Sequence, residues 1–240
     1  MYETTKGIVL HVLKYSDKNS IAHIYTDTRG RMSFLVPQGK TRGARIRNAM
    51  FMPLSVLEFE ASIVPGREIA SLKDARTLFP LVEIYCDPVK SAVAMFISEL
   101  LTRAIQESER NVGLWEYIAQ SVRLLDAMRE GVANFHICFL YNLGSFLGIQ
   151  PDTGSYHTGY WFDMENGVFT PTRPSRSHLQ PREAAVLMMI SRMSFSNLHL
   201  FRFSREQRNA VLDIALRYYA LHNSTVGNMR SPDILSQLFT

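Results

Sequence analysis

The sequence predicts an α+β fold, with a five-stranded barrel at the N-terminus and a mainly helical domain after it. Through the first eighty residues apolar side chains recur at every second position, as in strands with one buried face. Turn residues, and no helical stretch, separate these strands, which is typical of a small antiparallel barrel of the OB type. From Pro88 onward the apolar spacing becomes helical. We therefore place an OB-fold at residues 1–80 and a helical domain at 81–240.

Alternation and turn chemistry define the individual strands. The connection Asp27–Gly30 predicts a hairpin turn, because glycine adopts the positive φ that tight turns need. Pro53 is tolerable in the fourth strand at an edge or a bulge. Small barrels of other topologies are the competing prediction. The expected strands are residues 6–15, 20–26, 31–37, 50–61 and 67–75.

The helical domain shows amphipathic stripes with recognisable ends. Ser204 and Gln207 form a capping box, and Pro181 suits the first turn of another helix. The apolar stretch 132–149 has the all-round hydrophobicity of a central helix. An alternating aromatic segment near 156–171 predicts a β-hairpin insert, with a two-residue turn at Asn166-Gly167.

Positive charge is concentrated in the first third of the chain. The net charge is +4, yet residues 1–80 contain twelve basic and seven acidic residues, and six basic residues with no acid lie between Asp27 and Glu58. This asymmetry indicates a surface for a polyanion.

The segment Gly39-Lys40-Thr41 resembles part of a nucleotide-binding P-loop. That motif needs a second glycine five positions earlier, where Phe34 stands, and no apolar helical stripe follows. The sequence therefore excludes a P-loop here.

The alternative ligand of this loop is the phosphate backbone of a nucleic acid. Barrels of this type bind single strands with a basic groove and with aromatic side chains on which bases stack. Tyr15, Tyr25 and Phe34 are the candidate stacking residues, although Phe34 shares a face with core positions. The predicted phosphate contacts are Arg29, Arg31, Gly39, Lys40, Thr41, Arg42, Arg45 and Arg47.

Little in the sequence favours catalysis or a metal. His136 and Cys138 would point to opposite sides of a helix, and no nucleophile or zinc-protease motif occurs. The cysteines Cys86 and Cys138 are expected to be buried free thiols. No apolar run is long enough for a membrane span, and no signal peptide begins the chain. We expect a cytoplasmic protein that is not an enzyme and needs no cofactor.

The stretch "KGIVLHVLKYSDKNSIAHIYTDTRGRMSFLVPQGKTRGAR" and the end "LRYYALHNSTVGNMRSPDILSQLF" resemble the bacterial recombination mediator family RecO. The resemblance implies an OB-fold, a helical body and a zinc-ribbon-like insert. It also implies binding of single- and double-stranded DNA, strand annealing, and RecA loading together with RecR and single-stranded-DNA-binding protein. It places DNA contacts on Gly39, Lys40, Thr41 and Arg42, with Arg45 and Arg47 extending them.

The insert departs from the family pattern. Many members carry four cysteines there, whereas residues 149–178 contain none. Without thiolate ligands a tetrahedral zinc site cannot form, so zinc is not expected.

The resemblance further implies docking of the acidic, apolar-ended tail of single-stranded-DNA-binding protein. Such a tail needs a shallow apolar pocket edged by arginine. The alternative is that the segment 191–208 is an ordinary helix connection with solvated arginines. A second functional alternative is an interaction scaffold whose barrel binds RNA or a protein. The residues proposed for the tail are Arg192, Phe201, Arg202, Arg205 and Arg208.

Overall fold

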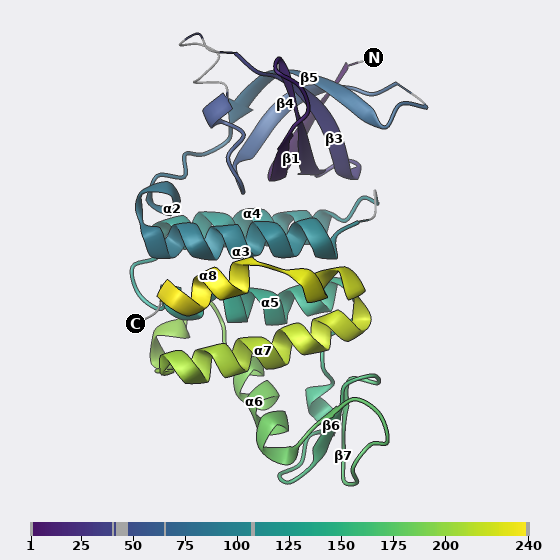
Figure 1. Cartoon of the computed structure of the whole chain (residues 1–240), viewed down its shortest axis with the longest axis vertical. Helices are drawn as coiled ribbons and strands as arrows, with labels where there is room; N and C mark the ends of the chain where they lie inside the picture. The colour runs from purple at the N-terminus through teal and green to yellow at the C-terminus, as the bar shows by residue number, and fades with distance from the viewer. Residues whose placement is uncertain (1, 40, 42–47, 65, 107–108, 239–240) are drawn as a thin grey trace. The chain divides into compact units, whose positions relative to one another are not determined.

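The computed structural model describes residues 2–39, 41, 48–64, 66–106 and 109–238. The chain forms two compact units, residues 1–127 and 128–240 (Figure 1). The first contains a β-barrel with the helices α2 to α4, and the second contains the helices α5 to α8 with a small sheet. The sequence-based division instead groups α3 and α4 with the later helices.

Five strands close into a barrel in the order β1-β2-β3-β5-β4. All neighbouring strands are antiparallel except β3 and β5, which run parallel. This architecture confirms the predicted fold class. The strands are β1 (Tyr2–Lys14), β2 (Asn19–Thr26), β3 (Gly30–Pro37), β4 (Val56–Ser62) and β5 (Ile69–Thr77).

Alternation along the strands fills the barrel. Ala22 and Phe34, which face each other across β2 and β3, are fully buried. Phe34 meets Phe59 of β4 edge to face, with ring centroids 5.1 Å apart. Burying one such phenyl ring contributes roughly 1.5–3 kcal/mol. Phe34 is therefore part of the core and is excluded as a stacking surface.

The turn between β2 and β3 has the expected geometry. Gly30 has a φ of 66°, and the Thr26 hydroxyl donates to the Gly30 carbonyl over 2.9 Å. The Asp27 carboxylate accepts hydrogen bonds from the Thr5 hydroxyl at 2.8 Å and the Lys6 amide at 2.9 Å. The predicted hairpin is confirmed.

The fourth strand was predicted too early, at residue 50. It begins at Val56, because Pro53 lacks an N–H for the ladder and Leu54 adopts a positive φ of 65°. This local conformation is fixed by strand β1: the Leu54 amide donates to the Val9 carbonyl at 2.7 Å, and the Val9 amide donates to the Ser55 carbonyl at 2.9 Å.

The described part of the first unit also contains the helices α2 (Glu83–Cys86), α3 (Pro88–Ala104) and α4 (Val112–Ala127). The Asp87 carboxylate caps α3 by accepting from the amides of Val89 and Lys90 at 2.8 and 3.1 Å. On the buried face of α3, the Ser98 hydroxyl donates to the Leu10 carbonyl of β1. Helix α3 is thereby fixed to the barrel.

In its described residues, the second unit consists mainly of α-helices and a small sheet. The helices are α5 (Phe135–Phe146), α6 (Pro181–Ser191), α7 (Arg205–His222) and α8 (Ser231–Leu238). Most side chains of α5 are buried, as its apolar circumference predicted. The Tyr219 hydroxyl of α7 donates to the Leu140 carbonyl of α5 at 2.5 Å. The capping box of α7 is confirmed: the Ser204 amide donates to the Gln207 side chain at 2.9 Å, and the Gln207 amide donates back to the Ser204 hydroxyl at 3.2 Å.

The aromatic insert forms a three-stranded sheet of β6 (Trp161–Asp163), β7 (Val168–Thr170) and β8 (His178–Leu179), in the order β7-β6-β8. The hairpin is confirmed, but its turn is wider than predicted. Four residues connect the strands, because the Asp163 carboxylate accepts from the amides of Glu165 and Asn166 at 2.9 and 3.1 Å. Phe162 packs against Tyr218 of α7, with centroids 5.5 Å apart.

The two cysteines differ from each other. Cys138 is buried as expected, and burial raises the pKa of its thiol to about 12. Cys86 is exposed, contrary to the prediction, because it lies at the end of the short helix α2.

Candidate nucleic-acid interface

The outward faces of β2 and β3 are polar near the hairpin that joins the two strands. Because Phe34 and Val36 are buried, alternation turns Arg31, Ser33 and Leu35 outward. Ser33 lies opposite His23, and its hydroxyl is 3.0 Å from His23 Nδ1. Burial lowers the pKa of His23, as do the charge of Arg31 and nearby His11. His23 is therefore neutral at neutral pH.

A cleft of about 670 Å³ continues this surface. Three separate segments form it: the β2–β3 hairpin, the β4–β5 connection and the connection after α3. Its arginines outnumber its single acid, Glu68. The cleft is lined by His23, Thr28, Arg29, Arg31, Met32, Ser33, Ile63, Arg67, Glu68, Gln106 and Arg110. Sequence reasoning identified Arg29 and Arg31 here but missed Arg67 and Arg110, which come from distant segments.

Arg29 is paired within the barrel. Its Nε and Nη2 donate to the two carboxylate oxygens of Glu3 at 2.7 and 3.0 Å. This hydrogen bonding lowers the pKa of Glu3. The charge of Arg29 is thus balanced by a neighbouring strand before any ligand arrives.

Arg31 has a structural partner as well. Its Nη1 donates to the carbonyls of Thr102 and Ile105 at 2.7 and 2.9 Å. These carbonyls belong to the C-terminal end of α3, where a cation is favoured by the helix dipole. Arg31 therefore fixes the end of α3 against the barrel and keeps its positive charge at the cleft.

The predicted basic loop is only partly described. Gly39 is partly buried and Thr41 is exposed. Lys40, Arg42, Arg45 and Arg47 lie outside the described residues, so their role in binding DNA stays a prediction.

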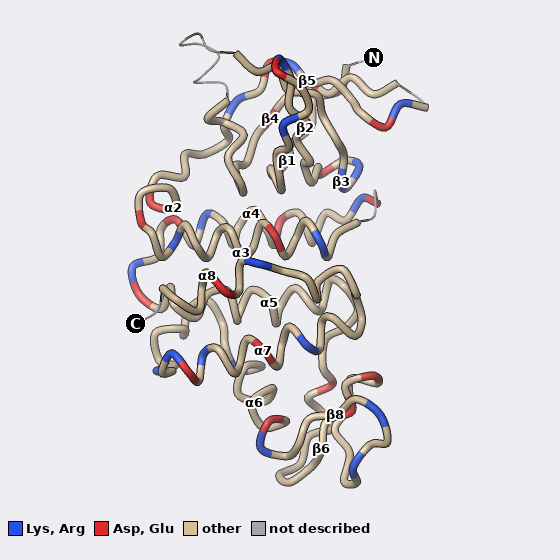
Figure 2. Tube along the Cα trace, viewed as in Figure 1, with Lys and Arg blue, Asp and Glu red and all other residues tan. Residues whose placement is uncertain are grey.

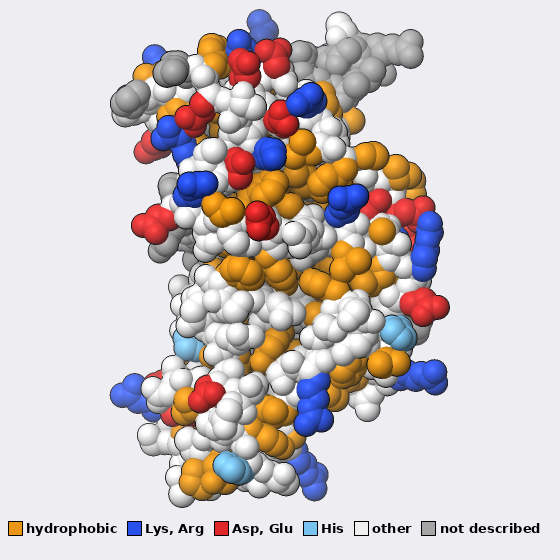
Figure 3. Space-filling model, turned by 180° about the vertical axis from the view of Figure 1, so that it is seen from behind, with side chains coloured by type: hydrophobic (Ala, Val, Ile, Leu, Met, Phe, Trp, Pro, Cys, Tyr) orange, Lys and Arg blue, Asp and Glu red, His pale blue; other side chains and the backbone are white. Residues whose placement is uncertain are grey.

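The rest of the barrel carries little excess charge. Without these four residues, the first eighty residues hold eight basic side chains against seven acidic ones. Four of the eight are paired: Lys14 with Asp17, Arg29 with Glu3, Lys73 with Glu60 and Arg76 with Glu58. Figure 2 shows basic and acidic residues interspersed along the trace of the described part of the first unit, and Figure 3 shows their side chains mixed on one face of it. Nearly all the excess positive charge thus comes from residues 40–47.

Four of the residues proposed for the acidic tail, Phe201, Arg202, Arg205 and Arg208, lie in or just before the first turn of α7, whereas Arg192 directly follows α6. Arg205 Nε donates to the Ser236 carbonyl at 2.6 Å, which links α7 to α8. Arg208 donates to the Asn134 side chain at 3.2 Å and to the Phe203 carbonyl at 3.1 Å. Arg192 and Arg202 are exposed, and Phe201 is partly buried. Arg205 and Arg208 thus form hydrogen bonds within the second unit, and docking of the acidic tail stays a prediction.

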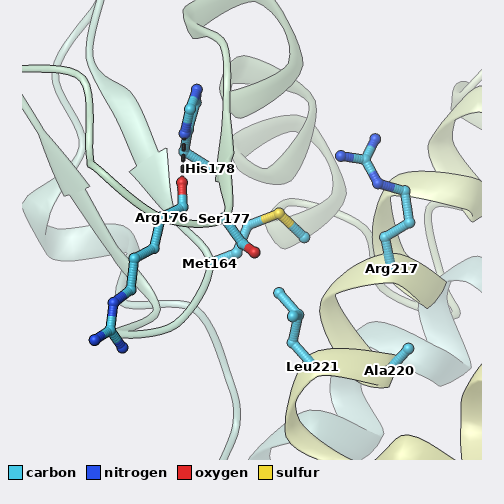
Figure 4. A pocket seen from close by; sticks show the side chains of 7 residues that line it. All are labelled: Met164, Arg176, Ser177, His178, Arg217, Ala220 and Leu221. Carbon is cyan, nitrogen blue, oxygen red and sulfur yellow. Dashed lines mark hydrogen bonds between the residues drawn. The ribbon is translucent and has the colours of Figure 1, made fainter.

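A second hollow, of about 420 Å³, lies between the small sheet and α7 (Figure 4). Met164 and Leu221 give it an apolar floor, and Arg217 extends from α7 at its edge. Arg217 lies 3.8 Å from both Glu183 and Asp213. These two acids offset its charge, and Glu165 lies 3.0 Å from Arg176, the other arginine that lines the hollow. Because both arginines already have acidic neighbours, the hollow offers little net positive charge to an anion.

Metal sites and membrane spans are the other kinds of feature that bear on function. Within the described ranges, no group of three or more His, Cys, Asp or Glu side chains is arranged to hold a metal ion. None of the helices in the described part of the chain is both long and apolar enough to cross a membrane.

Comparison with known proteins agrees with the architecture. Residues 1–81 match the family "Recombination protein O N terminal", and residues 86–225 match "Recombination protein O C terminal". DNA repair protein RecO of Bacteroides fragilis is 41% identical over 241 residues, covering all of both chains. The RecO proteins of Phocaeicola vulgatus and Porphyromonas gingivalis W83 are 39% and 34% identical, again over the full length of both chains. The chain therefore belongs to the RecO family of DNA repair proteins.

Proposed function

We propose that this protein is a DNA-binding recombination mediator in DNA repair. It binds single- and double-stranded DNA, promotes annealing of complementary strands and assists the loading of RecA. One observation carries the proposal: the chain has the RecO family's barrel, and its excess positive charge is concentrated in the segment that follows β3. OB-type barrels bind oligonucleotides with the outward face of their second and third strands.

Annealing on such a surface needs no covalent chemistry, and we propose no enzymatic activity. Two complementary strands repel each other through their phosphates. A basic surface that neutralises phosphates on both strands releases counterions and lowers this repulsion, so that base pairing drives the reaction. Residues 40–47 supply four basic side chains for this role.

The proposed partners follow from family membership. They are RecR, the C-terminal tail of single-stranded-DNA-binding protein and, indirectly, RecA. We propose that the helical unit binds these proteins while the barrel holds DNA, and that the protein acts in the cytoplasm, at the nucleoid.

We further propose that the protein works without zinc. The small sheet is stabilised by packing of Phe162 on Phe169 and Tyr218, with centroids 4.8 and 5.5 Å apart. Purified protein should contain much less than one zinc per chain, and a chelator should leave its melting temperature unchanged. One tightly bound zinc per chain would contradict this proposal.

The function is tested by strand annealing with one strand precoated by single-stranded-DNA-binding protein. The full-length chain should accelerate duplex formation, and replacing Lys40, Arg42, Arg45 and Arg47 by alanine should remove most of the acceleration. If the chain bound RNA or a protein partner but did not accelerate DNA annealing, the result would favour the alternative of an interaction scaffold. Turnover that depends on an added divalent metal would indicate an enzyme.

A further inference from the structure

A row of apolar side chains crosses the outside of the barrel. Leu13 of β1 lies opposite Ile21 of β2, and Ile21 lies opposite Leu35 of β3. Their strand neighbours Ala22 and Phe34 are buried in the core, so alternation turns the row outward. Leu13 is 47% exposed, and the other two are partly exposed. An apolar row that spans three strands on a solvent face indicates a contact surface.

Tyr15 extends this row at the β1–β2 turn. Its side chain is 65% exposed, whereas Tyr25, the other tyrosine considered for stacking, is 1% exposed. The turn itself is well fixed. The amides of Tyr15 and Ser16 donate to the Asn19 carbonyl at 3.1 and 2.9 Å, and the Asn19 amide donates back to the Ser16 hydroxyl at 3.1 Å. An exposed aromatic ring is thus carried on an ordered turn.

The same turn lies next to the end of β3, after which the basic segment follows in the sequence. The Gln38 amide donates to the Lys18 carbonyl at 2.7 Å, and Pro37 is paired with Asn19. The chain therefore leaves β3 directly beside the turn that carries Tyr15, and the four basic residues follow within ten positions. Lys18 adds a further exposed cation from the turn.

We propose that Tyr15 and the row Leu13, Ile21 and Leu35 form a platform for the bases of single-stranded DNA, and that this platform makes the barrel prefer single strands to duplex. The inference rests on the proposed DNA-binding function and specifies its ligand. In a single strand each base can stack on an aromatic ring while the backbone follows cationic groups. In a duplex the base faces are covered by their neighbours, so only the phosphate contacts remain.

Charge complementarity favours this occupant over a protein partner or a second copy of the chain. The platform lies beside the end of β3, and the segment that follows β3 in the sequence carries nearly all the excess positive charge of the barrel. A second copy would bring the same basic segment against itself, which is repulsive. A single DNA strand can contact the apolar row with its bases while its phosphates neutralise the basic side chains.

The test compares Tyr15→Ala and Tyr15→Phe in the full-length chain, with Tyr2→Ala as the matched control. Tyr2 is 51% exposed at the opposite end of the 13-residue strand β1. The probes are oligothymidylate, an abasic oligonucleotide of the same length, and a duplex of that length. Tyr15→Ala should weaken oligothymidylate binding by about 5- to 150-fold, the range for loss of one stacked base. It should change abasic and duplex binding little, and Tyr15→Phe and Tyr2→Ala should bind like the unmodified chain.

If Tyr15→Ala lost the same affinity for all three probes, the proposal of a base-binding platform would be wrong, because the effect would not depend on bases. Unchanged oligothymidylate binding by Tyr15→Ala would also overturn it. In that case the proposed function would still stand if alanine at Lys40, Arg42, Arg45 and Arg47 weakened binding. Failure of the unmodified chain to bind DNA at all would count against the proposed function itself. A change of oligomeric state in Tyr15→Ala, measured by sedimentation with DNA binding intact, would assign the row to a second copy.

Discussion

The backbone amide of Gln38 donates a hydrogen bond to the carbonyl of Lys18 over 2.7 Å. This hydrogen bond places the end of β3 beside the β1–β2 turn. The exposed side chain of Tyr15 thus lies near the point where the chain leaves β3, and the basic residues 40–47 follow that point in the sequence. Binding of a single strand uses both cations and a stacking surface, which is why we propose this end of the barrel as the DNA site.

Arg31 should be important for stability. In Arg31→Ala the carbonyls of Thr102 and Ile105 lose a charged donor, and hydrogen bonds to charged groups contribute on the order of 2 kcal/mol. Urea unfolding should show a loss of this size. The control is Arg29→Ala, whose exposed pair with Glu3 should contribute less than about 1 kcal/mol. Equal losses in the two variants would contradict the structural role of Arg31.

Gly30 should not tolerate a side chain. A Cβ at this position would overlap with the backbone oxygen of Glu109, in addition to the strain of a positive φ. Gly66 is the matched control, because it also has a positive φ but a Cβ there would meet no atom of the described residues within 4 Å. Gly66→Ala should cost about 1 kcal/mol of stability, and Gly30→Ala clearly more. Similar melting temperatures for the two variants would show that Glu109 does not approach Gly30 in solution.

His136 should make stability depend on pH. Complete burial, with a contribution from the charge of Arg208, lowers its pKa to about 3. The unfolded chain takes up a proton at this histidine near pH 6.5, but the folded chain does not until about pH 3. Protonation of the unfolded chain therefore lowers the free energy of unfolding below about pH 6.5, and this loss grows as the pH falls toward 3.

The measurement is urea unfolding of the unmodified chain and of His136→Gln at several pH values between 7 and 4. The free energy of unfolding of the unmodified chain should fall faster, by up to about 1.4 kcal/mol per pH unit relative to the variant. His199→Gln removes an exposed histidine of the same unit and should leave the pH dependence unchanged. Parallel curves for His136→Gln and the unmodified chain would contradict the burial of a neutral imidazole.

The proposed docking of the acidic tail is tested in the full-length chain. A tail peptide of single-stranded-DNA-binding protein should bind with salt-sensitive affinity, and charge reversal at Arg202 and Arg205 should abolish that binding. DNA binding should persist, since neither residue belongs to the barrel. Arg176→Glu, an exposed arginine of the same unit, is the control. Normal peptide binding by the double variant would place the tail elsewhere.

Much of the fold could be predicted because local rules determine it. Alternation identified the barrel strands, and the capping box at Ser204 identified the start of α7. The onset of β4 was missed, because the positive φ of Leu54 depends on its hydrogen bond to β1. The hairpin turn was predicted too short, because the Asp163 carboxylate organises a wider one.

The site was less predictable than the fold. The basic run is visible in the sequence, but Arg67 and Arg110 reach the cleft from segments that only the folded chain brings together. Alternation already indicated that Phe34 belongs to the core, but only the exposed fractions of the side chains distinguish Tyr15 from the buried Tyr25. The hairpin of the insert was predicted, but its third strand, β8, was not.

The most direct test of DNA binding by residues 40–47 is the salt dependence of affinity for a single-stranded oligonucleotide. The logarithm of the binding constant should fall linearly with the logarithm of salt concentration. In the variant with alanine at Lys40, Arg42, Arg45 and Arg47, the slope should decrease in magnitude by about 0.7 for each phosphate that is no longer neutralised, so by about 2.8 if each of the four residues neutralises one. The decrease should be the same for unrelated DNA sequences. An unchanged slope in a variant of unchanged stability would contradict the account.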